Sequence, residues 1–276
     1  MLRTPILITG CQRSGTTLVN LILDSHPGIW GIDEDRFAFP SIYRYLAEPL
    51  PQTPPFVSFK LPQYAHILPF IEMLPKRRIL WCIREPLDAV WSMIKLGSDR
   101  GVIPWVAHPD GGWLEIVNSY WALNDKQQEQ LKDHMMEFSR LTKKFVNISK
   151  SSGATPEIDR RDCVFIGALC WRIKNELPSL YSARNIDFHV NSYEDLVTNP
   201  KDRIAETLDY IGIEWSDEVL MHHRLHKGMS IGNTSNTRAI DKNSLGAGKK
   251  NLSREEQELI KSVCENTAQT WNYTFD

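Results

Sequence analysis

The sequence predicts an α/β fold, a single domain with a central parallel β-sheet flanked by helices. Short apolar runs at residues 6–8, 56–60, 77–83 and 188–191 have the length and composition of buried parallel strands. Segments with helical spacing of apolar residues lie between them, which is typical of strand–helix–strand units. A loop bounded by glycines, residues 10–15, joins the first run to a helix.

Composition limits the classes of partner. The chain has 276 residues, 42% of them hydrophobic, enough for one sizeable α/β core. Its formal net charge of −2 gives no electrostatic argument for binding nucleic acid or an anionic membrane. We therefore expect one domain over residues 1–276, with neither nucleic acid nor membrane as partner.

Cysteine usage and the N-terminus suggest a cytoplasmic protein. The five cysteines are odd in number and contain no C-x-x-C pair, which argues against a disulfide framework or a zinc site. The first strand begins within five residues, leaving no room for a signal peptide. No apolar run approaches the ~20 residues that a membrane span needs.

The loop after the first strand has the geometry of a phosphate site. Gly10 and Gly15 keep the spacing of the nucleoside-triphosphatase loop, G-x-x-x-x-G-K-[ST], but Thr16 stands where the lysine belongs. That lysine contacts the β- and γ-phosphates, whereas here the cation is Arg13, inside the loop. The helix N-terminus and its dipole favour an anion. The loop suits a ligand with a single 5′-phosphate; an ordinary strand–turn–helix is the alternative.

Residues 12–18, followed by Asp24-Ser25-His26-Pro27, resemble the 5′-phosphosulfate loop of the sulfotransferases. Those enzymes use 3′-phosphoadenosine-5′-phosphosulfate (PAPS) and release 3′,5′-bisphosphoadenosine (PAP). The resemblance implies a P-loop-like fold, PAPS as donor and no metal. It assigns loop contacts with the donor to Arg13, Ser14, Gly15, Thr16 and Thr17.

A candidate base follows the first helix. In the tyrosylprotein sulfotransferases a Glu-x-Arg lies at nearly this distance after the His-Pro, and its Glu is the base. Glu34-Asp35-Arg36 matches that pattern, so Glu34 is the expected base. Asp33 and Asp35 are alternatives, as is a solvated acidic turn.

The second strand ends in Lys60-Leu61-Pro62. In sulfotransferases a lysine here contacts the bridging oxygen of the donor, and a cation at that point stabilises the departing phosphate. The cytosolic enzymes read Lys-Thr-His-Leu-Pro, and that His is their base. This chain lacks it, which strengthens Glu34. His66 is a weaker alternative base, and a solvated strand end is the alternative role for Lys60.

The third strand ends at Arg84, with Pro86 in the first turn of the next helix and Ser92 eight residues after the arginine. This order matches a second sulfotransferase signature, in which the Arg and Ser hold the 3′-phosphate of the donor. Arginine suits the task because its planar fork binds phosphate bidentately. Pairing of Arg84 with Asp88 at the helix N-terminus is the alternative.

Two later segments complete the predicted site. Residues 97–125 are rich in Gly and Pro and predict a long loop, a lid or acceptor loop. Aromatic faces and carboxylates in it would favour a cationic acceptor, although packing is an equal explanation for its tryptophans. The residues concerned are Trp105, Trp113, Trp121, Asp110 and Glu115.

Tyr193, in a Tyr-Glu-Asp-Leu segment after the fourth strand, matches a family tyrosine that lies near the adenine. The polar tail, residues 226–251, resembles a segment that covers the donor in bacterial sulfotransferases. Its candidate contacts are Ser230, Gly232, Asn233 and Arg238, with Lys249 and Lys250 as further cations that are alternatively solvated. Helices are expected over 40–50, 64–74, 114–150, 160–183 with a kink at Pro178, and 201–211, and a capping box at Ser253–Glu256 opens the last helix.

The resemblance implies in-line sulfuryl transfer. Glu34 removes the acceptor proton, and Lys60, Arg13 and Ser230 stabilise the leaving phosphate. The expected acceptor is a small molecule, with a cationic secondary metabolite such as a cyanobacterial saxitoxin-type alkaloid as the finest hypothesis. Hydroxyl and nitrogen acceptors are both open. A phosphate-loop small-molecule kinase and a non-catalytic nucleotide-binding module are the alternative functions.

Overall fold

The computed structural model describes residues 2–34, 40–47, 54–71, 74, 76–98, 104–152, 159–230 and 234–275, without the side chains of 147–152 and 230. These residues form two compact units. The first combines Met1–Arg84 with Tyr181–Leu245, and the second combines Glu85–Leu180 with Gly246–Asp276.

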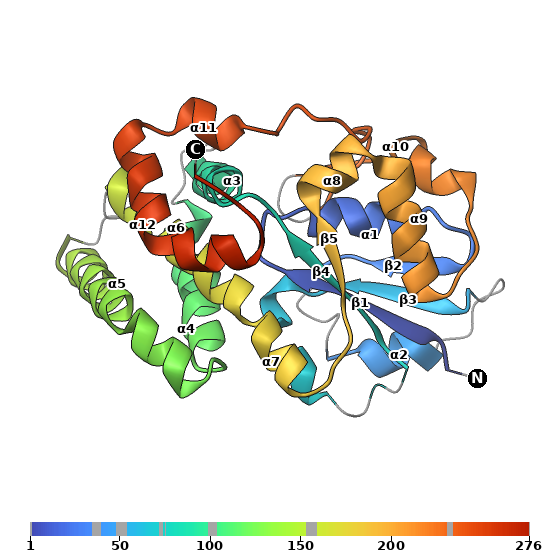
Figure 1. Ribbon diagram of the computed structural model, residues 1–276, viewed down its shortest axis with the longest axis horizontal. Helices are drawn as coiled ribbons and strands as arrows, with labels where there is room; N and C mark the ends of the chain where they lie inside the picture. Colours follow the sequence, from blue (N-terminus) through green and yellow to red (C-terminus); the bar gives the residue numbers. More distant parts are fainter. Residues whose placement is uncertain are drawn as a thin grey trace. The chain divides into compact units, whose positions relative to one another are not determined.

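The first unit contains a five-stranded sheet in the order β2-β3-β1-β4-β5, with every neighbouring pair parallel (Figure 1). Its strands are β1 (Thr4–Gly10), β2 (Ile29–Ile32), β3 (Phe56–Lys60), β4 (Arg78–Ile83) and β5 (His189–Ser192). The α/β class with a central parallel sheet is therefore confirmed. Sequence patterns predicted four of these strands, and β2 was missed.

Helices cover both faces of this sheet. The helices of the first unit are α1 (Thr16–Asp24), α2 (Ile42–Ala47), α8 (Tyr193–Thr198), α9 (Pro200–Ile211) and α10 (His222–Leu225). Ile6 of β1 and Leu80 of β4 pack in one core with Ile22 of α1 and Leu208 of α9. On the opposite face the ring of Phe59 packs against Tyr45 of α2. Because both faces are buried there, the central strands β1 and β4 are largely apolar rather than alternating.

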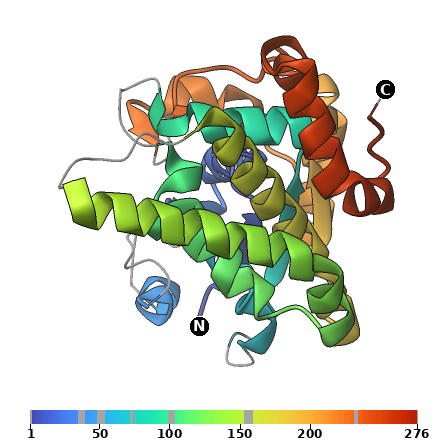
Figure 2. The same cartoon turned by 90° about the vertical axis from the view of Figure 1, so that its left-hand side faces the viewer.

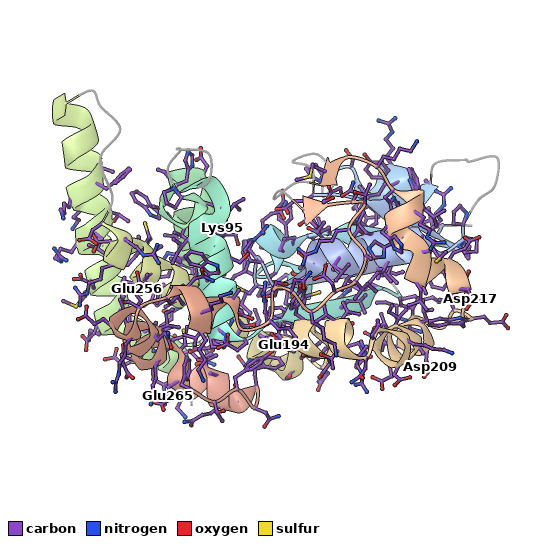
Figure 3. The ribbon with its side chains drawn as sticks, turned by 90° about the horizontal axis from the view of Figure 1, so that it is seen from above. Lys95, Glu194, Asp209, Asp217, Glu256 and Glu265 are labelled. Atoms are coloured by element: carbon purple, nitrogen blue, oxygen red, sulfur yellow. The ribbon has the colours of Figure 1, made fainter. Side chains whose placement is uncertain are left out.

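The second unit is helical. It contains α3 (Pro86–Ser98), α4 (Leu114–Tyr120), α5 (Asp125–Ser152), α6 (Arg160–Glu176), α11 (Ala247–Asn251) and α12 (Arg254–Thr270). Buried α6 contacts α3, α4 and α12. The long helix α5 also contacts α6 (Figure 2), and its sequence is largely polar. Ser253 and Glu256 form the predicted capping box at α12, and Glu256 also pairs with Arg160 (Figure 3).

A buried carboxylate joins two distant segments of the second unit. Asp88, in the first turn of α3, accepts the N–H groups of Gly246 and Gly248 at 2.9 and 2.7 Å. Gly248 lies so close to the backbone of Leu87 that a Cβ has no room. The C-terminal segment is thus fixed to the start of α3.

Two predicted elements were wrong. The helix expected over 64–74 is replaced by short 3₁₀ turns at Pro62–Tyr64 and Leu68–Phe70, because Pro69 interrupts an α-helical ladder. The described part of the loop predicted at 97–125 is largely helical, with a 3₁₀ turn at Trp105–Ala107, a π-helical turn at Pro109–Trp113, and α4. Residues 99–103 of that prediction lie outside the described part.

The interruption expected at Pro178 was confirmed. The helix over 160–183 is interrupted before Pro178: α6 ends at Glu176 and α7 covers Pro178–Ala183. The tail is a short hairpin of β6 (Met229–Ser230) and β7 (Thr234–Ser235) followed by turns. All five cysteines are buried free thiols. Within the described ranges, no helix has both the length and the apolar character to cross a bilayer.

Candidate active site

Each of the five parallel strands ends at a predicted site residue. Arg13 follows β1, Glu34 follows β2, Lys60 closes β3, Arg84 follows β4 and Tyr193 follows β5. Because the strands are parallel, their carboxyl ends meet at one edge of the sheet. β1 and β4 are neighbours in the sheet. The chain continues from β1 to β2 at one edge and from β4 to β5 at the other edge. In open α/β sheets, ligands bind at the point between two such strands.

The loop after β1 turns sharply through left-handed backbone. Gly10, Arg13 and Gly15 have φ values of 124°, 68° and 90°. A Cβ at Gly10 would collide with the backbone of Cys82 in β4, so only glycine fits there. The chain then enters α1 at Thr16, directing the first N–H groups of that helix toward the loop.

The loop contains a buried hydroxyl whose surroundings bear on phosphate binding. The side chain of Ser14 is 1% exposed, and its Oγ has no hydrogen-bond partner among the described residues. Buried polar groups are normally satisfied, so a hydroxyl in this state at a helix N-terminus suits an anionic oxygen. The residues present therefore fit a single phosphate.

Two arginines add positive charge beside the loop. Burial lowers the pKa of Arg13, and the charge of Arg84 lowers it further, while Tyr193 and Glu34 oppose the shift. A charged group whose pKa is reduced by a like charge is stabilised when an anion binds nearby. Arg13 and Arg84 thus form a site with a preference for anions.

Arg84 is held by three contacts. Its Nη1 donates to the main-chain oxygen of Arg13 at 3.4 Å, and its Nη2 donates to the main-chain oxygen of Ser244 at 2.6 Å. Its guanidinium lies 4.4 Å from the centre of the Tyr193 ring. The Tyr193 hydroxyl is 2.5 Å from Ser244 Oγ, and the ring lies against Gly15, where a Cβ would be 2.8 Å from Cδ2. Ser244 had not been predicted.

Lys60 lies among acceptors from two segments. It is 1% exposed, and its Nζ is 2.6 Å from Asp33 Oδ1, 3.5 Å from Glu34 Oε2 and 3.2 Å from Thr17 Oγ1. The structure therefore brings the predicted lysine together with the predicted base and one of its alternatives. Both carboxylates are within ion-pair distance, so the identity of the base stays a prediction.

The remaining predicted site residues lie on several other elements. Arg238 Nε binds Asp241 Oδ2 at 2.6 Å, and the charge of Arg238 interacts with Tyr193. The backbone of Ser230 pairs with Thr234 in the hairpin. Ser92 lies on α3 of the second unit, and His66 lies between the two 3₁₀ turns of the first. Gly232, Asn233, Asp35 and Arg36 lie outside the described residues, and Lys249 and Lys250 lie on α11.

Two of the five proposed acceptor residues are used in packing. Trp113 is buried with its ring centre 5.1 Å from that of Phe145, and Glu115 forms a buried ion pair of 2.6 Å with Lys174. Trp121 is 70% exposed at the end of α4. Packing thus explains Trp113 and Glu115, and Trp121 is available for other contacts. Among the described side chains, no group of three or more His, Cys, Asp and Glu could hold a metal ion.

Comparison with known proteins shows which proteins this chain resembles. Residues 5–55, from β1 to the start of β3, match the family model described as the sulfotransferase family. The sulfotransferase domain from the curacin biosynthetic pathway is similar in fold, with a TM-score of 0.55 and 15% identity over 99% of each chain. That of the Synechococcus PCC 7002 olefin synthase gives a TM-score of 0.53 and 15% identity, over 99% of this chain and 96% of that one.

No curated protein matches the sequence significantly. The matched segment contains the glycine-bounded loop, α1, β2 and Glu34, and the shared fold extends over nearly the whole chain. Together they show that this chain resembles sulfotransferases in one sequence segment and in its fold.

Proposed function

We propose that this protein transfers the sulfuryl group of PAPS to a hydroxyl or nitrogen of a small-molecule acceptor, and that both units form one sulfotransferase domain. The observation that carries the proposal is the convergence of Arg13, Lys60 and Arg84 at the carboxyl ends of neighbouring strands. The loop between them has Thr16 in place of the triphosphatase lysine. This arrangement suits a donor with one phosphate on its 5′ side and a second phosphate elsewhere.

The proposed donor contacts combine the geometry with the family pattern. The loop from Arg13 to Thr17 and the unsatisfied Ser14 hydroxyl would hold the 5′-phosphate. Arg84, with Ser92, would hold the 3′-phosphate, and Tyr193 would lie against the adenine. Ser230, Gly232, Asn233 and Arg238 are the proposed contacts from the tail.

The proposed reaction is a single displacement at sulfur. PAPS supplies the sulfuryl group and carries the leaving phosphate. Glu34 accepts the proton of the acceptor as its oxygen or nitrogen forms a bond to sulfur. The bond from sulfur to the bridging oxygen breaks, and its electron pair stays on the phosphate of PAP. Lys60 stabilises that charge, and needs little reorganisation because Asp33 and Thr17 already hold its ammonium group.

The acceptor is proposed from weaker support. Both structural relatives come from biosynthetic systems that their names identify as a curacin pathway and an olefin synthase. Natural-product tailoring in the cytoplasm is the corresponding proposal here. A cationic acceptor, with a saxitoxin-type alkaloid as the finest hypothesis, would contact Asp110 and the exposed Trp121.

Titration calorimetry with PAP, and with ATP in the absence and in the presence of magnesium, tests the donor site. We expect PAP to bind more tightly than ATP, and Arg84→Ala to weaken PAP by tenfold or more, because a charge-assisted contact is lost. Arg184→Ala is the matched control, since Arg184 stacks on Phe70 away from the loop. Preference for ATP with magnesium, or equal PAP binding by wild type and Arg84→Ala, would favour the kinase alternative. PAP binding with no sulfuryl transfer from PAPS to any acceptor, in the wild type as in Glu34→Ala, would favour the non-catalytic module.

A further inference from the structure

Ser244 makes two separate contacts with residues that follow strand ends. Its main-chain oxygen accepts from Arg84 Nη2 at 2.6 Å, and its Oγ is 2.5 Å from the Tyr193 hydroxyl. Arg84 lies 160 residues before Ser244, and Tyr193 lies 51 residues before Ser244. One tail residue therefore joins the ends of β4 and β5. A substitution of the side chain removes the contact with Tyr193 and leaves the contact with Arg84 available.

The Tyr193 ring is held from three directions. Gly15 of the phosphate loop lies against its edge, the Arg84 guanidinium lies over its face, and Ser244 binds its hydroxyl. Of these contacts only the last is a hydrogen bond to the phenol oxygen. The Ser244 hydroxyl therefore limits displacement of the phenol oxygen, and with it of the ring, within a site made of loop and cation.

The tail that carries Ser244 is itself braced. The main-chain oxygen of Arg238 is 3.1 Å from His222 Nε2, and the Arg238 side chain pairs with Asp241. Asp241 Oδ1 accepts the N–H of Asn243 at 2.9 Å. Ser244 thus sits at the end of a segment fixed by α10 at its start, which allows its hydroxyl to hold Tyr193 in place.

We infer that Ser244 is a positioning residue for the donor nucleotide. Its hydroxyl orients Tyr193 for stacking with a purine, and its carbonyl orients Arg84 toward a phosphate, before the nucleotide arrives. The inference rests on the proposed function, because it takes a purine nucleoside bisphosphate as the ligand. Such preorganisation lowers the ordering cost of binding.

A double-mutant cycle on PAP binding tests this role. Ser244→Ala and Tyr193→Phe each remove one partner of the hydroxyl pair, and each should weaken PAP about 3- to 10-fold, the loss expected for one hydrogen bond. The double variant should be no weaker than either single variant, because the same bond is lost once. Ser244→Thr, which keeps a hydroxyl, should restore most of the affinity.

Ser235→Ala is the matched control, since Ser235 lies in the same tail and its Oγ contacts Thr237. It should bind PAP like the wild type. Additive losses in the double variant, or wild-type affinity in Ser244→Ala, would overturn the positioning role while leaving the donor site intact. Failure of the wild type itself to bind PAP would instead overturn the proposed function and this inference with it. A fall in melting temperature without a change in affinity would show that the bond is merely structural.

Discussion

Lys60 Nζ lies 2.6 Å from Asp33 Oδ1, the same oxygen that accepts the N–H of Glu34 at 2.7 Å. The distance from Lys60 to Glu34 Oε2 is 3.5 Å. Asp33 is therefore the carboxylate that fixes the lysine, and Glu34 is held less tightly by it. A base must take up a proton during the reaction, and the less tightly held carboxylate does so at a smaller cost in lost contacts.

Substitution of these two carboxylates should separate their roles. We expect Glu34→Gln to lower kcat by about 10²- to 10⁴-fold, the usual contribution of a general base, with PAP affinity nearly unchanged. Asp33→Asn should lower kcat by less than about tenfold, because the amide oxygen can still accept from Lys60. Chromatographic measurement of PAP release with an acceptor found by screening gives both rates. A larger loss in Asp33→Asn would make Asp33 the base.

Gly15 should tolerate no side chain. Its φ is 90°, and a Cβ there would lie 2.8 Å from the Tyr193 ring, so Gly15→Ala adds a collision to backbone strain. We expect PAP affinity to fall by more than tenfold. Gly228→Ala is the matched control, since Gly228 has φ 79° and no atom of the described residues lies within 4 Å of its Cβ position. That variant should lose about 1 kcal/mol of stability from strain and bind PAP normally. Equal effects on affinity in the two variants would contradict the role of the Gly15–Tyr193 contact.

His222 should make stability depend on pH. Its side chain is completely buried, and burial lowers its pKa from 6.5 to about 4, although its hydrogen bond to the Arg238 carbonyl opposes the shift. On acidification the unfolded chain takes up the proton near pH 6.5, whereas the folded chain resists until about pH 4. The unfolded state therefore binds more protons in this window, and the free energy of unfolding falls as pH falls, by up to about 3 kcal/mol.

Urea denaturation between pH 4 and pH 7 checks this expectation. His222→Gln retains an N–H donor for the Arg238 carbonyl but does not titrate, so its stability should change less across the window. His134→Gln serves as a comparison, because the pKa of His134 is also lowered by burial. Parallel pH profiles for wild type and His222→Gln would exclude His222 as the source of the dependence.

Sequence patterns predicted those parts of the fold that depend on local chemistry. The buried strands appear as apolar runs because both faces of the sheet are covered, and the phosphate loop appears through Gly10 and Gly15. β2 gave no such signal, since it is a four-residue edge strand containing Gly31. That glycine is required because Asp24 of α1 approaches it too closely for a Cβ, a tertiary reason.

The wrong prediction for the segment before α4 also has a tertiary cause. Gly111 and Gly112 suggested a flexible loop, but their missing side chains allow the π-helical turn to pack on the backbone of Trp105 and Val106. At the site, the strand-end residues were predictable from the family pattern. Ser244 was not, because its importance depends on partners 51 and 160 residues away.

The strand order has a consequence for synthesis on the ribosome. β4 pairs on one side with β1 early, but its other neighbour, β5, is made only after residues 84–188 have been added. During that interval the nascent chain presents an unpaired edge of an apolar strand, the kind of surface that recruits another chain. Pairings this distant also slow folding. Newly made protein should therefore need chaperone protection until its fifth strand emerges, and fragments ending before His189 should aggregate.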